Sequence, residues 1–279
     1  MRKSLVIAFY QIMAWRREYK AWAAFALCLA FCILNVSKYV SFSATLGYRI
    51  QAAEAYVIIG SSIHYYTGIL LGALLLLSDS PFINARSPYE ILRAGRRIWL
   101  HGQVHYIVMS VILYSLCTAL FCIMVSAFSG NIYFENSWSE AMALLAKRQP
   151  SFAILEFKLS FPYGEFVDAV SPYGAMLMTL FFNSCYICLL CLCMFAVNVY
   201  SSRCLGWIAA IMVHIAGYVI IANGPIMFPQ RYSLLACSFP ANQYVEAFGI
   251  TPLYVTTIFV VLIGLLIFIS DRRAQKVAI

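Results

Sequence analysis

Two histidines, His101 and His105, are spaced so that one helical face would carry both imidazoles, and such a pair can bind a metal ion. The spacing lacks the glutamate of the H-E-x-x-H zinc motif, which acts as the general base in metalloproteases. The pair also stands at the beginning of an apolar segment. We therefore interpret both residues as interfacial histidines and predict no metal site.

Four polar residues inside or beside apolar segments are candidates for a transport pathway, because ionisable or amide groups within a membrane are functional candidates by default. They are His64, Asn183, Asn198 and His214. For the two histidines a packing role with a satisfied hydrogen bond is the favoured interpretation. For the two asparagines, hydrogen bonding across helices and lining of a path remain open alternatives.

Four of the ten cysteines resemble a ligand cluster: Cys185, Cys188, Cys191 and Cys193. They lie in the middle of an apolar segment, where a helix has no loop to fold around a metal. Small, weakly polar residues for helix packing are the better interpretation. Only Cys237 is predicted to be external, so no disulfide framework is expected.

None of the six lysines has the G-x-x-x-x-G-K-[ST] context of a phosphate-binding loop. The chain is therefore predicted to supply no ATPase of its own, to hold no cofactor and not to be an enzyme.

The composition describes the elements that must position these residues. Of the 279 residues, 63% are hydrophobic and 11% are charged, whereas about a quarter of a soluble domain is charged. The mean hydropathy is +0.83. A helix needs about 20 mainly apolar residues to cross the hydrocarbon. Six stretches qualify, at 21–42, 56–78, 101–128, 173–200, 204–222 and 252–270.

The fold expected is an all-α polytopic membrane protein with six transmembrane helices in a single domain, 1–279. Residues 1–20 have an apolar centre too short to span between two basic ends, and are predicted as an interfacial helix. A signal peptide is the alternative, but Arg16, Arg17 and Lys20 stand where a small-residue cleavage site would be. Within 56–78, the Gly68-x-x-x-Gly72 motif predicts a close helix contact.

The positive-inside rule orients the chain. With both termini cytoplasmic, thirteen of the nineteen Lys and Arg fall in inner segments and seven of the eleven acids in outer ones. Orientation explains the net charge of +8, so no nucleic-acid partner is predicted. The outer loops are 129–172 and 223–251. The second is apolar enough that short helices dipping into the outer leaflet are expected.

The inner loop, 79–100, is the remaining substantial segment. Ser87 can cap a helix, Pro88 suits its first position, Glu90 can complete a capping box and Gly95 is a natural stop. The pattern predicts a helix of about two turns from Pro88 to Ala94. A loop that only holds orientation is one interpretation, and a rigid element that docks a cytoplasmic partner is the other.

The motifs Asp79-Ser80-Pro81-Phe82, Arg86-Ser87-Pro88-Tyr89 and Arg93-x-Gly95-Arg96, together with the six spans, resemble the type-2 family of ABC exporter permeases, of the small Gram-positive bacterial kind. The resemblance implies a membrane subunit in the bacterial cytoplasmic membrane that exports an amphiphilic or peptidic substrate. It implies as partners a separate ATPase carrying ATP and Mg, a second permease copy or relative, and membrane lipid. The long 129–172 loop departs from the compact outer arrangement of that family.

In that family the inner helix is the coupling helix. The residues that correspond to ATPase docking here are Ser87, Pro88, Tyr89, Glu90, Leu92, Arg93, Arg96 and Arg97, and those that correspond to a structural role in the loop are Asp79, Pro81 and Gly95.

Two other classes of function stay open. One is a substrate-capture membrane subunit of a vitamin uptake transporter, which would need no capped inner helix. The other is an intramembrane enzyme built on His64, His101, His105 or His214.

Overall fold

The structure, a computed structural model, describes residues 2–81, 87–201, 203–223 and 230–274. Phe82 and Arg86 of the quoted motifs lie outside the described residues. Within the described part of the chain, five helices are long and apolar enough to cross a membrane. They are α2 (Tyr19–Leu46), α6 (Arg96–Ala127), α10 (Pro172–Tyr200), α11 (Arg203–Ala222) and α13 (Pro252–Ala274). The chain is thus a multi-pass membrane protein, and five of the predicted spans are confirmed as helices.

The predicted span 56–78 is broken, which corrects the expectation of one continuous helix. It consists of α3 (Glu54–Gly60) and α4 (Ile63–Leu76), with Ser61 and Ser62 between them. At 14 residues, α4 is only about 21 Å long, and the hydrocarbon is about 30 Å thick. The break lies against α10, where a Cβ on Gly60 would collide with Thr179.

The close contact predicted from the Gly68-x-x-x-Gly72 motif is confirmed. A side chain on Gly68 would collide with the ring of Phe31 on α2, and one on Gly72 with the hydroxyl of Tyr114 on α6. The Tyr114 hydroxyl donates to the carbonyl of Ile69 at 2.8 Å. The two glycines therefore let α4 approach both neighbouring helices, as small residues do in membrane bundles.

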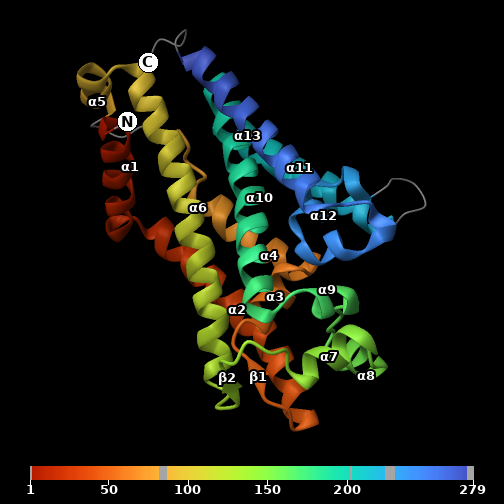
Figure 1. The fold of residues 1–279 in the computed structure, drawn as a ribbon. Helices are drawn as coiled ribbons and strands as arrows, with labels where there is room; N and C mark the ends of the chain where they lie inside the picture. The colour runs from red at the N-terminus through yellow and green to blue at the C-terminus, as the bar shows by residue number, and fades with distance from the viewer. Residues whose placement is uncertain (1, 82–86, 202, 224–229, 275–279) are drawn as a thin grey trace.

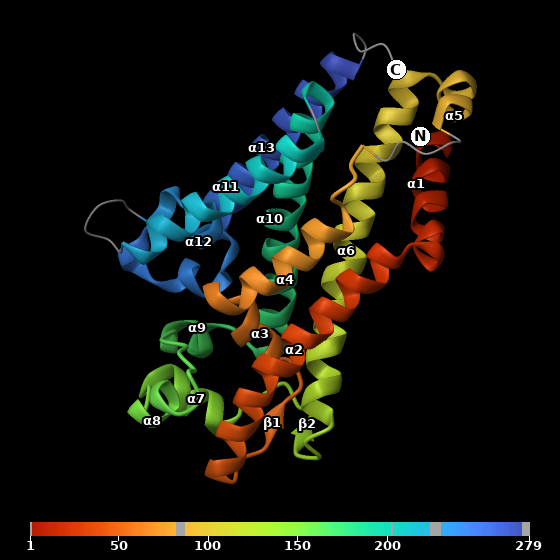
Figure 2. The ribbon, with the colours of Figure 1, turned by 180° about the vertical axis from the view of Figure 1, so that it is seen from behind.

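The N-terminal helix, α1 (Arg2–Ala14), lies lengthwise along the first half of α6 (Figure 1 and Figure 2). A short 3-10 turn, η1 (Trp15–Arg17), joins it to α2. The indole N–H of Trp15 donates to the Tyr106 hydroxyl at 2.7 Å. A Cβ on Gly102 would lie 2.9 Å from Ile7. A helix within 1–20 is confirmed, and the structure adds that it is packed on a long helix.

The short elements of 129–172 lie at the opposite end from α5, whereas α12 lies at the side of the bundle (Figure 1). Strands β1 (Ile50–Gln51) and β2 (Ile132–Tyr133) pair in parallel. The remaining short elements are α7 (Glu140–Lys147), α8 (Ser151–Leu155), α9 (Gly164–Ala169), η3 (Gln230–Tyr232), α12 (Leu234–Ser238), η4 (Pro240–Tyr244) and η5 (Glu246–Phe248). The short helices predicted within 223–251 are thereby confirmed.

The two outer segments fold against each other. The Tyr163 hydroxyl donates to Asn242 Oδ1 at 2.9 Å, and the rings of Phe166 and Tyr244 meet at a centroid distance of 5.2 Å. Burial raises the pKa of Tyr163 to about 12. These contacts join 129–172 and 230–251 in one packed unit.

Cys237, which was predicted to be external, is buried within the folded segment 230–251. Its side chain is fully covered within α12, and its thiol lies 3.6 Å from the carbonyl of Arg231. Burial raises the pKa of this thiol to about 12. The apolar segment around Cys237 packs against α10 and α11. Hydropathy alone cannot distinguish such a packed segment from an apolar surface loop.

Cys237 should consequently resist alkylation. We expect a membrane-impermeant maleimide at neutral pH to leave it unmodified, because a pKa near 12 instead of 9 leaves about a thousandth as much thiolate. A Phe134→Cys variant is the matched control, since Phe134 is 64% exposed in the same outer unit. Mass spectrometry of the two cysteine-containing peptides measures the result. Equal labelling of both sites would contradict the burial of Cys237.

Candidate functional site

The inner loop forms a short helix, α5 (Ser87–Ala94), immediately before α6. The N–H of Gly95 donates to the Ile91 carbonyl at 2.8 Å and closes the helix. Gly95 has a φ of +83° with open space around it, so the backbone conformation, and not crowding, favours glycine here. Both the helix and its stop at Gly95 are confirmed. The predicted cap depends on the side chains of Ser87 and Pro88. The structure describes only the backbone of these two residues, so the cap lies outside what is described.

The faces of α5 differ. Tyr89 and Leu92 are 70% and 83% exposed, and Arg93 is exposed beside them. Ile91 is partly buried against the core, and Glu90 lines a space shared with α1. An exposed leucine and tyrosine on a short polar helix form an apolar surface that the described chain leaves uncovered. The structure therefore separates Glu90 from the face formed by Tyr89 and Leu92, while Arg93 borders both that face and the space shared with α1.

The chain segment that follows α4 is held by contacts with both α2 and α10. Asp79 forms an ion pair with Lys20 at the beginning of α2. The side-chain amide of Asn198 donates to the carbonyl of Ser80 at 2.5 Å, and its oxygen accepts from the N–H of Gly206 at 2.9 Å. Asn198, expected as a pathway residue, thus joins α10, α11 and this loop. Pro81 is buried in the same turn.

The end of α13 is tied to the start of α6 by Asp271, which sequence reasoning did not single out. Arg97 Nη2 lies 3.4 Å from Asp271 Oδ2, and His101 Nε2 lies 3.8 Å from Oδ1. The ring of His105 contacts the His101 carbonyl at 2.5 Å. Among the described residues, no group of three or more His, Cys, Asp or Glu is arranged to hold a metal. The sequence feature that could have indicated Asp271 is its position as an acidic residue directly after the last apolar stretch.

His214 connects three helices through both ring nitrogens. Thr67 donates its hydroxyl hydrogen to the Ile63 carbonyl at 2.8 Å, so the Thr67 oxygen must accept from Nε2 of His214, 3.1 Å away. The Tyr186 hydroxyl lies 3.1 Å from Nδ1, within hydrogen-bond distance. Both ring nitrogens therefore have a hydroxyl partner. His214 is therefore a satisfied link between α4, α10 and α11.

His64 lies elsewhere. Its side chain is exposed, and its ring meets the ring of Tyr218 at a centroid distance of 6.1 Å. The structure does not bring His64 together with His214 in one site.

Asn183 lies at the break between α3 and α4. Its side-chain amide donates to the Gly60 carbonyl at 3.1 Å, and its backbone carbonyl accepts from the Tyr66 hydroxyl at 3.0 Å. The cavity beside it, which Ser115 also lines, has a volume of about 10 Å³. That volume holds about one water molecule. In this conformation Asn183 thus belongs to a packed junction and does not line an open path.

A second polar junction, centred on Glu54, was missed from the sequence. Glu54 is 0% exposed. Its Oε2 accepts from the Tyr39 hydroxyl at 2.8 Å, from the Ser139 hydroxyl at 2.8 Å and from the Gln51 N–H at 3.1 Å. Its Oε1 accepts from the Ser139 N–H at 2.6 Å. The carboxylate thereby joins α2, β1, α3 and the beginning of α7.

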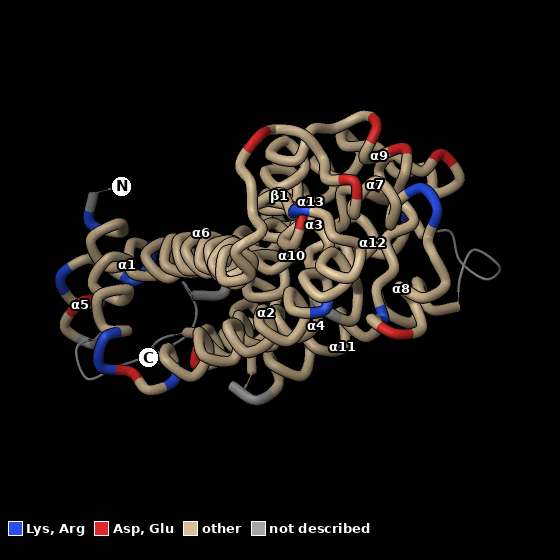
Figure 3. The backbone as a smooth tube through the Cα atoms, turned by 90° about the horizontal axis from the view of Figure 1, so that it is seen from below, with Lys and Arg blue, Asp and Glu red and all other residues tan. Residues whose placement is uncertain are grey.

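Charge is distributed unevenly between the two ends. A group of Lys and Arg surrounds α1 and α5, whereas Asp and Glu gather around α7 and α9 (Figure 3). No protein-family model, curated protein or solved structure matches the chain. The functional proposal therefore depends on α5, its exposed side chains and this charge distribution.

Proposed function

We propose that the chain is the membrane-spanning permease subunit of an ATP-driven ABC exporter in a bacterial cytoplasmic membrane. It would dock a separate ATPase through α5 and work with a second copy or a related permease. Its cargo would be amphiphilic or peptidic, as in the type-2 exporters that the inner-loop motifs resemble. ATP and Mg would be bound by the ATPase, since none of the lysines of this chain has the sequence context of a phosphate-binding loop.

The proposed topology has six crossings, the second made by α3 and α4 together, and both termini in the cytoplasm. Its support is that α5, the beginning of α1 and the end of α13 lie at one end of the bundle (Figure 1). The cations around α1 and α5 are what the positive-inside rule expects of a cytoplasmic face.

The observation that carries the proposal is the uncovered face of α5. Leu92 and Tyr89 are large, apolar and mostly exposed, on a helix that ends at a defined glycine and is followed directly by α6. A partner bound to these side chains could displace α5. The displacement would be transmitted to α6, because a single residue, Gly95, connects the two helices. Buried apolar or aromatic side chains at the centre of an interface dominate binding energy.

Leu92→Glu should weaken this docking. Co-expressed with the ABC ATPase of its genomic neighbourhood, the wild-type chain should retain the ATPase through affinity purification. The variant should bind it about thirtyfold more weakly, as expected for a central interface residue. The amount of ATPase recovered and the ATP hydrolysis of the purified complex measure the effect.

Phe128→Glu is the matched control, because Phe128 is 86% exposed at the other end of α6. It should leave ATPase recovery unchanged. Recovery that is unaffected by Leu92→Glu, or reduced equally by both changes, would contradict docking through α5.

A further inference from the structure

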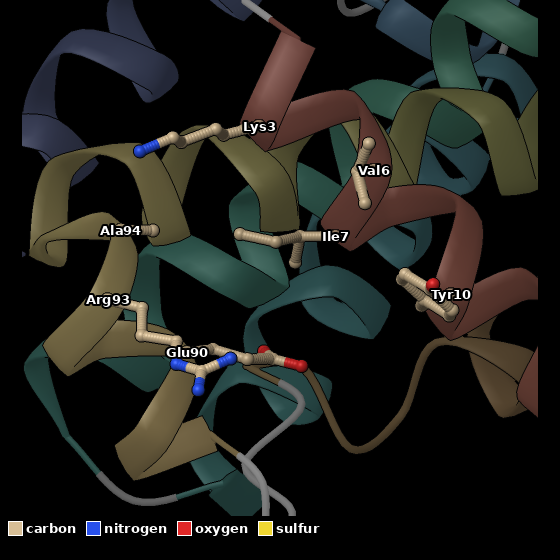
Figure 4. Close-up of a pocket in the computed structure, with 7 residues that line it drawn as sticks. All are labelled: Lys3, Val6, Ile7, Tyr10, Glu90, Arg93 and Ala94. Carbon is tan, nitrogen blue, oxygen red and sulfur yellow. The ribbon is translucent and has the colours of Figure 1, made fainter.

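Beside the docking surface formed by Tyr89 and Leu92, α5 borders a groove that it shares with α1, and Arg93 lies at the edge between the two. The groove has a volume of about 470 Å³ and is lined by Lys3, Val6, Ile7, Tyr10, Glu90, Arg93 and Ala94. Figure 4 shows Ile7 and Tyr10 on one side of this space and Glu90 and Arg93 on the other. Small-molecule sites commonly have volumes of about 300–1,000 Å³.

The groove opens next to an apolar surface. Besides Val6 and Tyr10, the exposed side chains of α1 include Leu5, Phe9 and Met13. In a multi-pass membrane protein such a surface contacts acyl chains, as the apolar face of an interfacial helix does. A ligand that entered the groove from this side would therefore have an apolar part against α1.

The polar groups of the groove specify the other part of that ligand. Lys3 and Arg93 carry positive charge, and both side chains are exposed at the groove. Glu90 carries one negative charge, and its Oε2 is buried with no hydrogen-bond partner in the described part of the chain. An anion beside the two cations and a hydroxyl or ammonium donor beside Glu90 would satisfy all three groups.

We propose that this α1–α5 groove binds an anionic phospholipid whose headgroup carries hydroxyl groups, of the phosphatidylglycerol type. The phosphate lies between Lys3 and Arg93, a glycerol hydroxyl donates to Glu90 Oε2, and the acyl chains extend along Val6 and Tyr10. The net charge of the three ionised side chains is +1, which complements a headgroup of charge −1. A zwitterionic headgroup would leave that charge uncompensated. The inference does not depend on ATPase docking.

Native mass spectrometry of the purified full chain, titrated with short-chain lipids, tests the proposal. Short-chain phosphatidylglycerol should bind more tightly than phosphatidylethanolamine, and more tightly than phosphatidic acid, which lacks the hydroxyl for Glu90. Free glycerol phosphate should bind weakly, because it lacks the acyl chains. Lys3→Glu should weaken phosphatidylglycerol binding about tenfold, because it replaces a cation that attracts the phosphate with an anion that repels it.

Arg17→Glu makes the same charge change on an exposed side chain at the other end of α1, outside the groove, and it should change binding less than twofold. Val6→Trp should also weaken binding by filling the groove, while Phe9→Trp, on the same helix outside it, should not. Equal losses in Lys3→Glu and Arg17→Glu, or equal binding of phosphatidylglycerol and phosphatidylethanolamine, would overturn the assignment. None of these variants alters Tyr89 or Leu92, so failure here is distinguishable from failure of ATPase docking.

Discussion

Replacing Glu54 with alanine is expected to lower the free energy of unfolding by about 3 kcal/mol or more, because each buried donor left without a partner costs about 1–3 kcal/mol. The change would remove the shared acceptor of Tyr39, Gln51 and Ser139. These groups are all buried, so water could not replace the carboxylate. Thermal unfolding of the purified chain in detergent micelles, followed by tryptophan fluorescence, measures the loss.

Two further variants define what the Glu54 result means. Glu54→Gln keeps one acceptor oxygen but replaces the other with an NH2 group, which would face the groups that donate to Glu54. It should therefore destabilise the chain by an intermediate amount. Glu135→Ala removes an exposed carboxylate in the same outer unit and should leave the unfolding temperature unchanged. If Glu54→Ala unfolded at the same temperature as Glu135→Ala, the junction would not contribute to stability.

Gly206→Val is expected to prevent α11 from packing on α10. A Cβ at Gly206 would overlap both the backbone carbonyl of Met194 and the side-chain oxygen of Asn198. Overpacking of side chains costs about 1–3 kcal/mol, and a clash with backbone is harder to relieve than one with the end of a flexible side chain. The same change would break the Gly206 N–H to Asn198 hydrogen bond and release the loop that precedes α5. The yield of monodisperse protein and its unfolding temperature are the measurements.

Gly264→Val is a close control for this prediction. Gly264 also lies in a long apolar helix, α13, but a Cβ there would meet open space. Both variants put a β-branched residue into a helix, so the helix propensity cost is shared. The difference between them isolates the α10–α11 contact. A Gly206→Val protein as stable as Gly264→Val would show that the two helices are not closely packed at this point.

The short inner helix shows which structural features local sequence can predict. Gly95 predicted where α5 ends because a left-handed φ is a property of one residue and its neighbours. Tyr89, Leu92 and Arg93 have the three- and four-residue spacing that puts side chains on one side of a helix, and all three are exposed. Spacing did not reveal that Glu90 turns toward α1, since α1 lies more than 70 residues away in the chain. The groove between α1 and α5 is therefore a product of tertiary packing.

The membrane class and the positions of five long helices were determined by the sequence itself. Lipid requires the backbone polar groups of a span to be paired within the segment, so most of the apolar stretches of sufficient length form one continuous helix, and 56–78 is the exception. Helices α2, α6, α10, α11 and α13 accordingly begin and end within about five residues of the predicted spans.

Tertiary structure alone decided where the chain departs from that pattern. The break at Ser61 and Ser62 lies against Thr179 and Asn183 of α10, more than 100 residues later in the sequence. Glu54 is buried because α2 and the beginning of α7 converge on it, and Cys237 is buried because its segment folds onto α10 and α11. Hydropathy averages over neighbours in the chain, whereas these features depend on partners in space.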